Sequence, residues 1–291
     1  KLLIDCYNMD LTISSKKIGN PLLVELLRKL TVSFNRMHRE FYVIGATARD
    51  IILKQVVGSE SKRRTMDLDI AIAIPNWETF AEVQDVLVAD GFEKSRDFKQ
   101  RFYYREYELD IVPYGNVAKD NDIIYWPPEE DIAMSVKGFD EVLSNSITVS
   151  IDNEFSVKIA SLHGLFVLKL DAWVDRNLET SKDAEDMSYI LQNYFMANID
   201  RGIHSEVYEW KDFHEYVAGA YWIAFDIANL LKKEHLTYYI DTIKDELKKE
   251  EESRLINQIV ENTRSLNYDT IRKAWQMIVD VLQDAVKNYE I

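Results

Sequence analysis

Residues 64–74 of the chain read RTMDLDIAIAI, with two aspartates two positions apart at the head of an apolar run. The run that follows Asp69 is apolar and rich in β-branched side chains, which is typical of a buried strand. Residues two apart on a strand project from the same face, so Asp67 and Asp69 would lie side by side while Leu68 points into the core. Two carboxylates this close repel each other unless a proton or a cation lies between them. Mg²⁺ commonly binds through one or two carboxylates and substrate phosphates, so the pair favours phosphoryl or nucleotidyl chemistry.

A strand that ends at a glycine precedes the two aspartates. Residues 41–53 read FYVIGATARDIIL, and the short apolar run gives way at Gly45 to a helical pattern. Glycine lets the backbone approach a phosphate closely, and the first N–H groups of a helix have no partners within the helix. The turn is therefore predicted to bind an anion. A plain strand-to-helix turn is the alternative.

A third acidic residue lies on a later predicted strand. Residues 102–115 read FYYREYELDIVPYG, and Asp110 stands there between two aliphatic residues. An acid flanked by core residues is costly to bury unless it is paired or ligates a metal. Glu108 shares the alternation of Asp110, so a solvent-facing acidic stripe is the alternative. The strand is expected to end at Pro113 and Gly115.

Taken in this order, the three segments resemble the nucleotidyltransferase superfamily that includes DNA polymerase β. The resemblance is greatest to its AbiEii-type group, the toxins of type IV toxin–antitoxin systems. It rests on GATAR at residues 45–49, TMDLD at residues 65–69 and DIVPYG at residues 110–115. The wider superfamily usually has Gly-Gly or Gly-Ser in the first motif. Here Ala46 follows Gly45, which keeps the turn compact but lacks a serine hydroxyl that some relatives offer to phosphate.

A fourth segment extends the resemblance, which covers roughly residues 40–195. KLDAWVDR at residues 169–176, followed by SKDAEDM at residues 181–187, is similar to a Lys-x-x-Ala, Arg and Lys-Asp-x-x-Asp signature of the AbiEii-type enzymes. For Lys182 and Asp183, an ordinary surface pair near a helix N-terminus is the alternative.

The resemblance implies a two-metal nucleotidyl transfer. Asp67 and Asp69 would hold one Mg²⁺ on the triphosphate of an NTP. Asp110 would share a second Mg²⁺ with them, at which an acceptor hydroxyl attacks the α-phosphorus and pyrophosphate leaves. Lys169 is predicted to be catalytic together with these three acids. The predicted nucleotide-binding residues are Gly45, Ala46, Thr47, Arg49, Thr65, Lys182, Asp183 and Asp186.

The fold class that follows is α+β. Residues 1–160 are predicted to form a nucleotidyltransferase domain with a short mixed sheet, and residues 161–291 a helical C-terminal domain that closes the nucleotide cleft. A chain of 291 residues suffices for about two domains. A hairpin is expected at residues 147–159, and residues 113–145 are expected to be mostly loop. Helix N-caps are expected at Asn20, Asn76 and Ser181.

Charge and cysteine content set further expectations. The net charge of −15 argues against a broad, nonspecific grip on nucleic acid. A local basic rim could still approach RNA, although solvated charges are the alternative; its members would be Lys62, Arg63, Arg64, Lys99, Arg101 and Arg105. The single cysteine, Cys6, cannot form an internal disulfide. With no signal peptide or membrane-spanning segment in the sequence, a cytoplasmic location without membrane contact is predicted.

Three alternatives for function remain at this point. The acceptor could be the 3′ end of tRNA, which some AbiEii-type relatives use. It could instead be a small molecule such as an aminoglycoside, or a protein hydroxyl. The third alternative is a non-catalytic nucleotide-binding or toxin–antitoxin interaction protein that has kept the fold. The resemblance also implies a cognate antitoxin as a partner.

Overall fold

The computed structural model describes residues 11–58, 66–130, 132–199, 207, 209–263 and 265–288. The chain divides into two compact units, Lys1–Ser161 and Leu162–Ile291. The fold is α+β, as predicted, with a mixed sheet in the first unit and helices in the second. Within the described ranges, no helix combines the length and the apolar character needed to cross a membrane.

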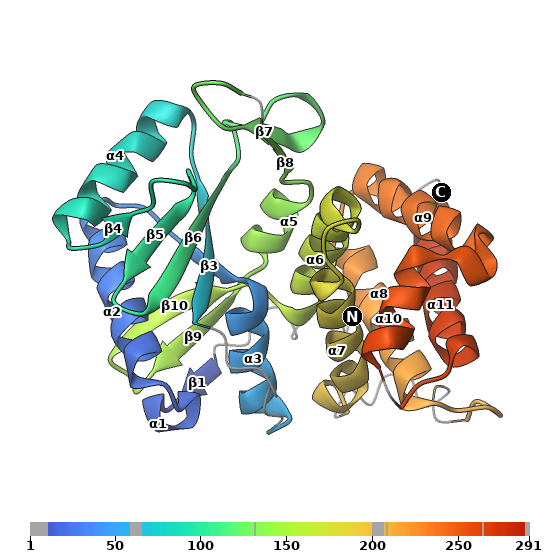
Figure 1. The fold of residues 1–291 in the computed structure, drawn as a ribbon. Helices are drawn as coiled ribbons and strands as arrows, with labels where there is room; N and C mark the ends of the chain where they lie inside the picture. Colours follow the sequence, from blue (N-terminus) through green and yellow to red (C-terminus); the bar gives the residue numbers. More distant parts are fainter. Residues whose placement is uncertain are drawn as a thin grey trace. The chain divides into compact units, whose positions relative to one another are not determined.

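A mixed sheet forms the centre of the first unit (Figure 1). In the described residues it has eight strands in the order β1-β9-β10-β2-β3-β6-β5-β4. The strands are β1 Leu11–Ile13, β2 Tyr42–Ile44, β3 Asp67–Ala73, β4 Glu93–Lys94, β5 Arg101–Tyr104, β6 Tyr107–Tyr114, β9 Ile147–Ile151 and β10 Phe155–Ile159. β3 and β6 are parallel, whereas β2 is antiparallel to β3 and β5 is antiparallel to β6. The predicted hairpin is the antiparallel pair β9–β10, which joins the sheet through β2.

Helices cover both faces of this sheet. In Figure 1, α2 and α4 lie along one face, and α3 and α5 lie along the other. The helices of the first unit are α1 Ser15–Ile18, α2 Pro21–Arg36, α3 Gly45–Val56, α4 Trp77–Ala89 and α5 Phe139–Ser144, with a 3₁₀ turn at Asp120–Asp122. The predicted caps of α2 and α4 are confirmed, because the Asn20 and Asn76 side chains accept hydrogen bonds from the backbone of the first turn.

The region from residue 113 to 145 is more ordered than predicted. β6 continues through Pro113, which pairs with Ile72 of β3. By strand alternation the nitrogen of Pro113 faces the same side as the N–H of Ile111, which donates to Gln100. Pairing with β5 ends at Asp110, so a missing N–H costs little at Pro113. Beyond β6, the chain forms the hairpin of β7 Ile123–Tyr125 and β8 Ala133–Ser135, and then α5.

The second unit is helical throughout its described part, and its interior is apolar and aromatic. Trp275, Tyr239 and Tyr194 are among its buried side chains. The predicted cap at Ser181 is wrong in one respect. The Ser181 side chain makes no capping hydrogen bond, although the backbone carbonyl of Ser181 accepts a hydrogen bond from the N–H of Glu185. The helices are α6 Leu162–Arg176, α7 Lys182–Ala197, α8 Glu215–Leu230, α9 Lys233–Lys248, α10 Arg254–Asn262 and α11 Tyr268–Asn288, with a 3₁₀ turn at Glu250–Glu252.

Candidate active site

The three predicted acids lie on one face of the sheet. Asp69 of β3 is the register partner of Asp110 of β6, and Asp67 is the partner of Glu108. Register partners on neighbouring strands project to the same side, so Asp67, Asp69 and Asp110 share a face. Leu68, between the two aspartates of β3, is fully buried, as expected for the opposite face. On β6, Tyr107 has the opposite alternation to Asp110 and accepts a hydrogen bond from Asn20 at the N-terminus of α2, so the acids lie on the face away from α2.

The turn at Gly45 lies directly against Asp69. Gly45 begins α3 at the end of β2, and its φ is +71°, a conformation that residues with a Cβ rarely adopt. A Cβ at this position would lie 2.2 Å from Oδ2 of Asp69. Only a glycine leaves room for the carboxylate here. The N-terminal end of α3 carries partial positive charge, which attracts the carboxylate beside it.

Thr47, in the first turn of α3, fixes this helix to the acidic strand. Its hydroxyl donates a 3.2 Å hydrogen bond to the backbone carbonyl of Asp67. The hydroxyl thus holds the start of β3 and leaves the Asp67 side chain exposed. The contact explains how the turn and the two aspartates are kept in register.

Arg101 holds both oxygens of the Asp110 carboxylate. Arg101 is the register partner of Asp110 across β5 and β6, so the two side chains share a face. Its Nε donates to Oδ1 and its Nη2 to Oδ2, both at 2.8 Å, while Nη1 lies 2.6 Å from Oε2 of Glu108. The hydrogen bonds from Arg101 to Asp110 raise the pKa of the guanidinium further above its usual value. In the sequence, Arg101 was expected only as a member of a basic rim.

The donor set on this face suits a hard divalent cation, because all three side chains are carboxylates. The close approach of Asp69 to Gly45 places one of these donors at a compact turn. In the described part of the chain, however, no three carboxylate, imidazole or thiol groups gather into a set that could hold a metal ion. Asp67, Asp69 and Asp110 thus share a sheet face without forming such a set in the described residues, and the Asp110 carboxylate is held by Arg101.

The other predicted nucleotide-binding residues of the first unit have different surroundings. Ala46 lies in the first turn of α3 beside Gly45. Arg49 is buried in α3, and its Nη2 lies 2.7 Å from the carboxylate of Asp50. Thr65 lies outside the described residues, as do the basic residues Lys62, Arg63 and Arg64.

In the second unit, the predicted residues form a network of ion pairs between α6 and α7. Lys169 Nζ lies 3.2 Å from Asp183 and 2.7 Å from Asp186. Arg176 binds both oxygens of Asp183 at 2.7 and 2.8 Å. Asp183 is fully buried, so it is placed to hold the two cations and has no surface to offer a nucleotide. The Lys182 side chain, in contrast, is exposed.

Asp183→Asn is expected to destabilise the second unit by about 2 kcal/mol, because a charge-assisted bidentate bond is lost at a buried site. Burial alone would raise the pKa of Asp183, but Arg176 and Lys169 outweigh it and hold that pKa below its usual 3.8. Asp183 thus contributes fully above its unfolded-state pKa of about 3.9, and the contribution is lost as pH falls through the lower folded-state pKa.

Urea unfolding of the variant between neutral pH and pH 3 measures both effects. Wild type should lose its advantage over Asp183→Asn as the pH falls below about 4. Asp245→Asn is the matched control, since Asp245 is exposed and its ion pair with Lys248 lies within one turn of the same helix. An advantage that stays constant down to pH 3 would show that the Asp183 carboxylate is not the stabilising group.

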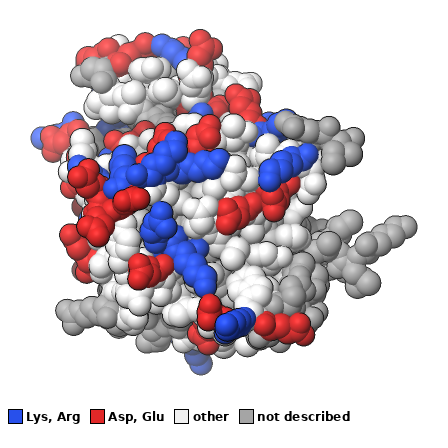
Figure 2. All heavy atoms as spheres, turned by 90° about the vertical axis from the view of Figure 1, so that its right-hand side faces the viewer, with Lys and Arg blue, Asp and Glu red and all other residues white. Residues whose placement is uncertain are grey.

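The described members of the predicted basic rim are each paired with an acid. Lys99 lies 2.5 Å from Glu129, and Arg105 lies 2.8 Å from Glu25. Figure 2 shows Lys and Arg side chains interspersed with Asp and Glu on the face that it draws. Neither observation indicates a broad basic surface, in agreement with the net charge of −15.

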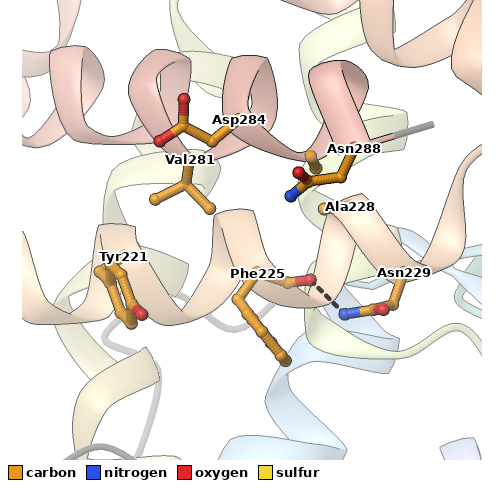
Figure 3. Close-up of a pocket in the computed structure, with 8 residues that line it drawn as sticks. Tyr221, Phe225, Ala228, Asn229, Val281, Asp284 and Asn288 are labelled. Atoms are coloured by element: carbon orange, nitrogen blue, oxygen red, sulfur yellow. Dashed lines mark hydrogen bonds between the residues drawn. The ribbon is translucent and has the colours of Figure 1, made fainter. Parts of the chain in front are cut away.

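One pocket lies apart from these residues, in the second unit. It has a volume of about 440 Å³ and lies between α8 and α11 (Figure 3). Tyr221 and Phe225 of α8 face Val281 and Asp284 of α11 across it. No residue predicted as catalytic or nucleotide-binding lines this pocket.

Comparison with known proteins gives a family. The model of a family described as nucleotidyl transferase AbiEii toxin, type IV TA system, matches residues 26–281. A search of curated proteins finds no match. JHP933 from Helicobacter pylori has a crystal structure that is 12% identical over 96% of this chain and 95% of its own, with a TM-score of 0.38.

Two structures of ANT(2″)-Ia are similar at the same low level. The crystal structure in complex with adenylyl-2″-tobramycin is 12% identical, covers 68% of this chain and 97% of its own, and has a TM-score of 0.34. The solution structure of this antibiotic-resistance factor is 11% identical, covers 62% of this chain and 85% of its own, and has a TM-score of 0.34. Likeness at this level says nothing about the substrate of the present chain.

Proposed function

Since the chain belongs to the AbiEii family of nucleotidyltransferase toxins, we propose that it transfers a nucleoside monophosphate from an NTP to an acceptor hydroxyl and releases pyrophosphate. The observation that supports this reaction is the placement of Asp67, Asp69 and Asp110 on one sheet face, with the Gly45 turn against Asp69. Carboxylates beside a free helix N-terminus suit a ligand that brings both phosphate and divalent metal.

The proposed roles follow from these positions. Asp67 and Asp69 would hold the Mg²⁺ that accompanies the triphosphate, and Asp110 would share a second Mg²⁺ with them where the acceptor hydroxyl is oriented. Bound Mg²⁺ would supply charge neutralisation at the phosphates and a lower pKa for the acceptor hydroxyl. The backbone N–H groups at Gly45 and Ala46 donate to phosphate oxygens, because no residue of the helix itself uses them.

The second unit contributes cations in this proposal. Lys169 neutralises phosphate charge, and Asp183 and Arg176 act on it by fixing its position. Lys182 is exposed and free of such a network, so we assign it a direct phosphate contact. The closing of a nucleotide cleft by residues 161–291 remains a prediction.

For the acceptor, we propose the 3′ end of a tRNA, with a cognate antitoxin as the protein partner and the cytoplasm as the place of action. The family supports a toxin–antitoxin role. The strongly acidic chain supports few phosphate contacts with RNA, so binding should fall only modestly with salt. A small molecule such as an aminoglycoside, or a protein hydroxyl, is the alternative acceptor.

An acceptor assay tests this choice. The protein is incubated with Mg²⁺, each of the four NTPs labelled at the α-phosphate, and total tRNA, an aminoglycoside mixture or no added acceptor. Label on tRNA that is removed by 3′-terminal exonuclease digestion is the expected result. Label on the aminoglycosides or on the protein itself, with none on tRNA, would replace tRNA by that acceptor.

A further inference from the structure

Arg101 makes a set of contacts on the acidic face that the transfer reaction does not by itself require. Its guanidinium occupies both oxygens of Asp110 through two 2.8 Å hydrogen bonds. The Asp110 side chain is 20% exposed and the Arg101 side chain 22% exposed, so the pair is partly shielded from water. Charge-assisted bidentate pairs of this kind are among the stronger hydrogen-bonded contacts in proteins.

This ion pair and a metal ion compete for the same oxygens. Arg101 uses one lone pair on each oxygen of Asp110, and its positive charge would repel a divalent cation there. Asp110 is therefore a weaker metal ligand while Arg101 holds both of its oxygens.

Glu108 offers Arg101 a second place on the same face. Nη1 already lies 2.6 Å from Oε2 of Glu108, two residues along β6 from Asp110. The Phe98 ring lies 5.0 Å from the guanidinium carbon and covers it in part. A change of side-chain torsions can thus transfer Arg101 to Glu108 without a change in the strands, because one of its bonds to Glu108 exists beforehand.

We propose that Arg101 is a positioning residue that clamps Asp110 in the metal-free enzyme and is retained by Glu108 when a divalent cation binds. The inference rests on the proposed function, since it assumes that Asp110 is a metal ligand. In this arrangement the positive charge of Arg101 offsets the repulsion among the carboxylates until a metal ion arrives with the nucleotide. Glu108 then lowers the free-energy cost of releasing Asp110, because it keeps an ion pair with Arg101.

Titration with Mn²⁺, followed by the electron paramagnetic resonance signal of the free ion, tests the clamp without measuring transfer. Arg101→Gln removes the competitor and is expected to bind Mn²⁺ roughly tenfold more tightly than wild type. Glu108→Gln leaves Arg101 with Asp110 alone and is expected to bind Mn²⁺ more weakly. The double variant should behave like Arg101→Gln, because Glu108 acts only through Arg101.

Two controls keep the result interpretable. Arg36→Gln breaks another arginine–aspartate pair of the same unit, a more exposed one with Asp90, and should leave Mn²⁺ affinity unchanged. Arg101→Lys keeps the charge but loses the bidentate contact, so its Mn²⁺ affinity should rise less than that of Arg101→Gln. This variant replaces Arg101→Gln in the test if Arg101→Gln does not fold. Thermal melting in metal-free buffer establishes folding for each variant.

The outcomes separate this inference from the proposed function. Unchanged or weaker Mn²⁺ binding in both Arg101 variants, while Asp110→Asn still weakens binding, would overturn the clamp and leave the metal site in place. Wild-type Mn²⁺ binding that does not depend on Asp110 would overturn both the clamp and the proposed role of Asp110 as a metal ligand, whereas failure of the transfer itself is read from the acceptor assay. Tighter Mn²⁺ binding by the Glu108→Gln variant would also contradict the clamp, since it would mean that Glu108 itself opposes metal binding.

Discussion

Gly45→Ala is expected to abolish nucleotidyl transfer and to lower stability. The new Cβ would lie 2.2 Å from Oδ2 of Asp69, so the carboxylate must leave its place beside the α3 turn. The backbone there has a φ of +71°, which costs a residue with a Cβ about 1–2 kcal/mol. Transfer rate and melting temperature, measured on the same preparation, report the two effects separately.

Gly91→Ala is the matched control for this substitution. Gly91 also has a positive φ, +89°, but a Cβ at that position meets no atom within 4 Å. The Gly91→Ala variant should therefore lose a similar amount of stability and keep full transfer activity. If Gly45→Ala were as active as Gly91→Ala, the closeness of Gly45 and Asp69 would have no part in catalysis.

Asp67→Asn is expected to reduce transfer by roughly 10²–10³-fold, the loss that follows removal of one group that stabilises transition-state charge. The melting temperature should stay unchanged or rise. The Asp67 side chain is exposed, and the bond that ties this residue to Thr47 uses its backbone carbonyl, which asparagine keeps. Relief of repulsion among the acids would favour the folded state.

Glu93→Gln serves as the comparison for Asp67→Asn. Glu93 is another exposed acid at the start of a strand in the same sheet, but it lies on β4, which β6 and β5 separate from β3. It should change neither transfer nor melting temperature. A large drop in melting temperature for Asp67→Asn would show that Asp67 is structural and that its loss of activity comes from misfolding.

The family and the shared face of the acids could be predicted because both depend on local sequence. Strand alternation alone puts Asp67 and Asp69 on one side, and the motifs carry the family. The ion pair of Arg101 with Asp110 depends on the register of two strands, which strand alternation alone does not give. A two-residue turn at Arg105 and Glu106 pairs Tyr104 with Tyr107, and counting back from it would have paired Arg101 with Asp110.

The burial of Asp183 in the second unit could not be predicted from the sequence either. Helical spacing predicts that Asp183 and Asp186 are near each other, but it does not say that α6 packs against Asp183 and removes it from solvent. The continuation of β6 through Pro113 was missed for a similar reason. A proline is acceptable there because β5 has already ended its pairing, which is a property of the assembled sheet.

The central claim is that the chain moves a nucleoside monophosphate and not a phosphoryl group, and paired labels test it most directly. The same NTP is supplied with its label at the α-phosphate or at the γ-phosphate, together with Mg²⁺ and tRNA. We predict α-label on the acceptor and γ-label in pyrophosphate, in equal amounts, with both signals lost in Asp67→Asn. Transfer of the γ-label to the acceptor, or equal signals in Asp67→Asn and wild type, would contradict the account.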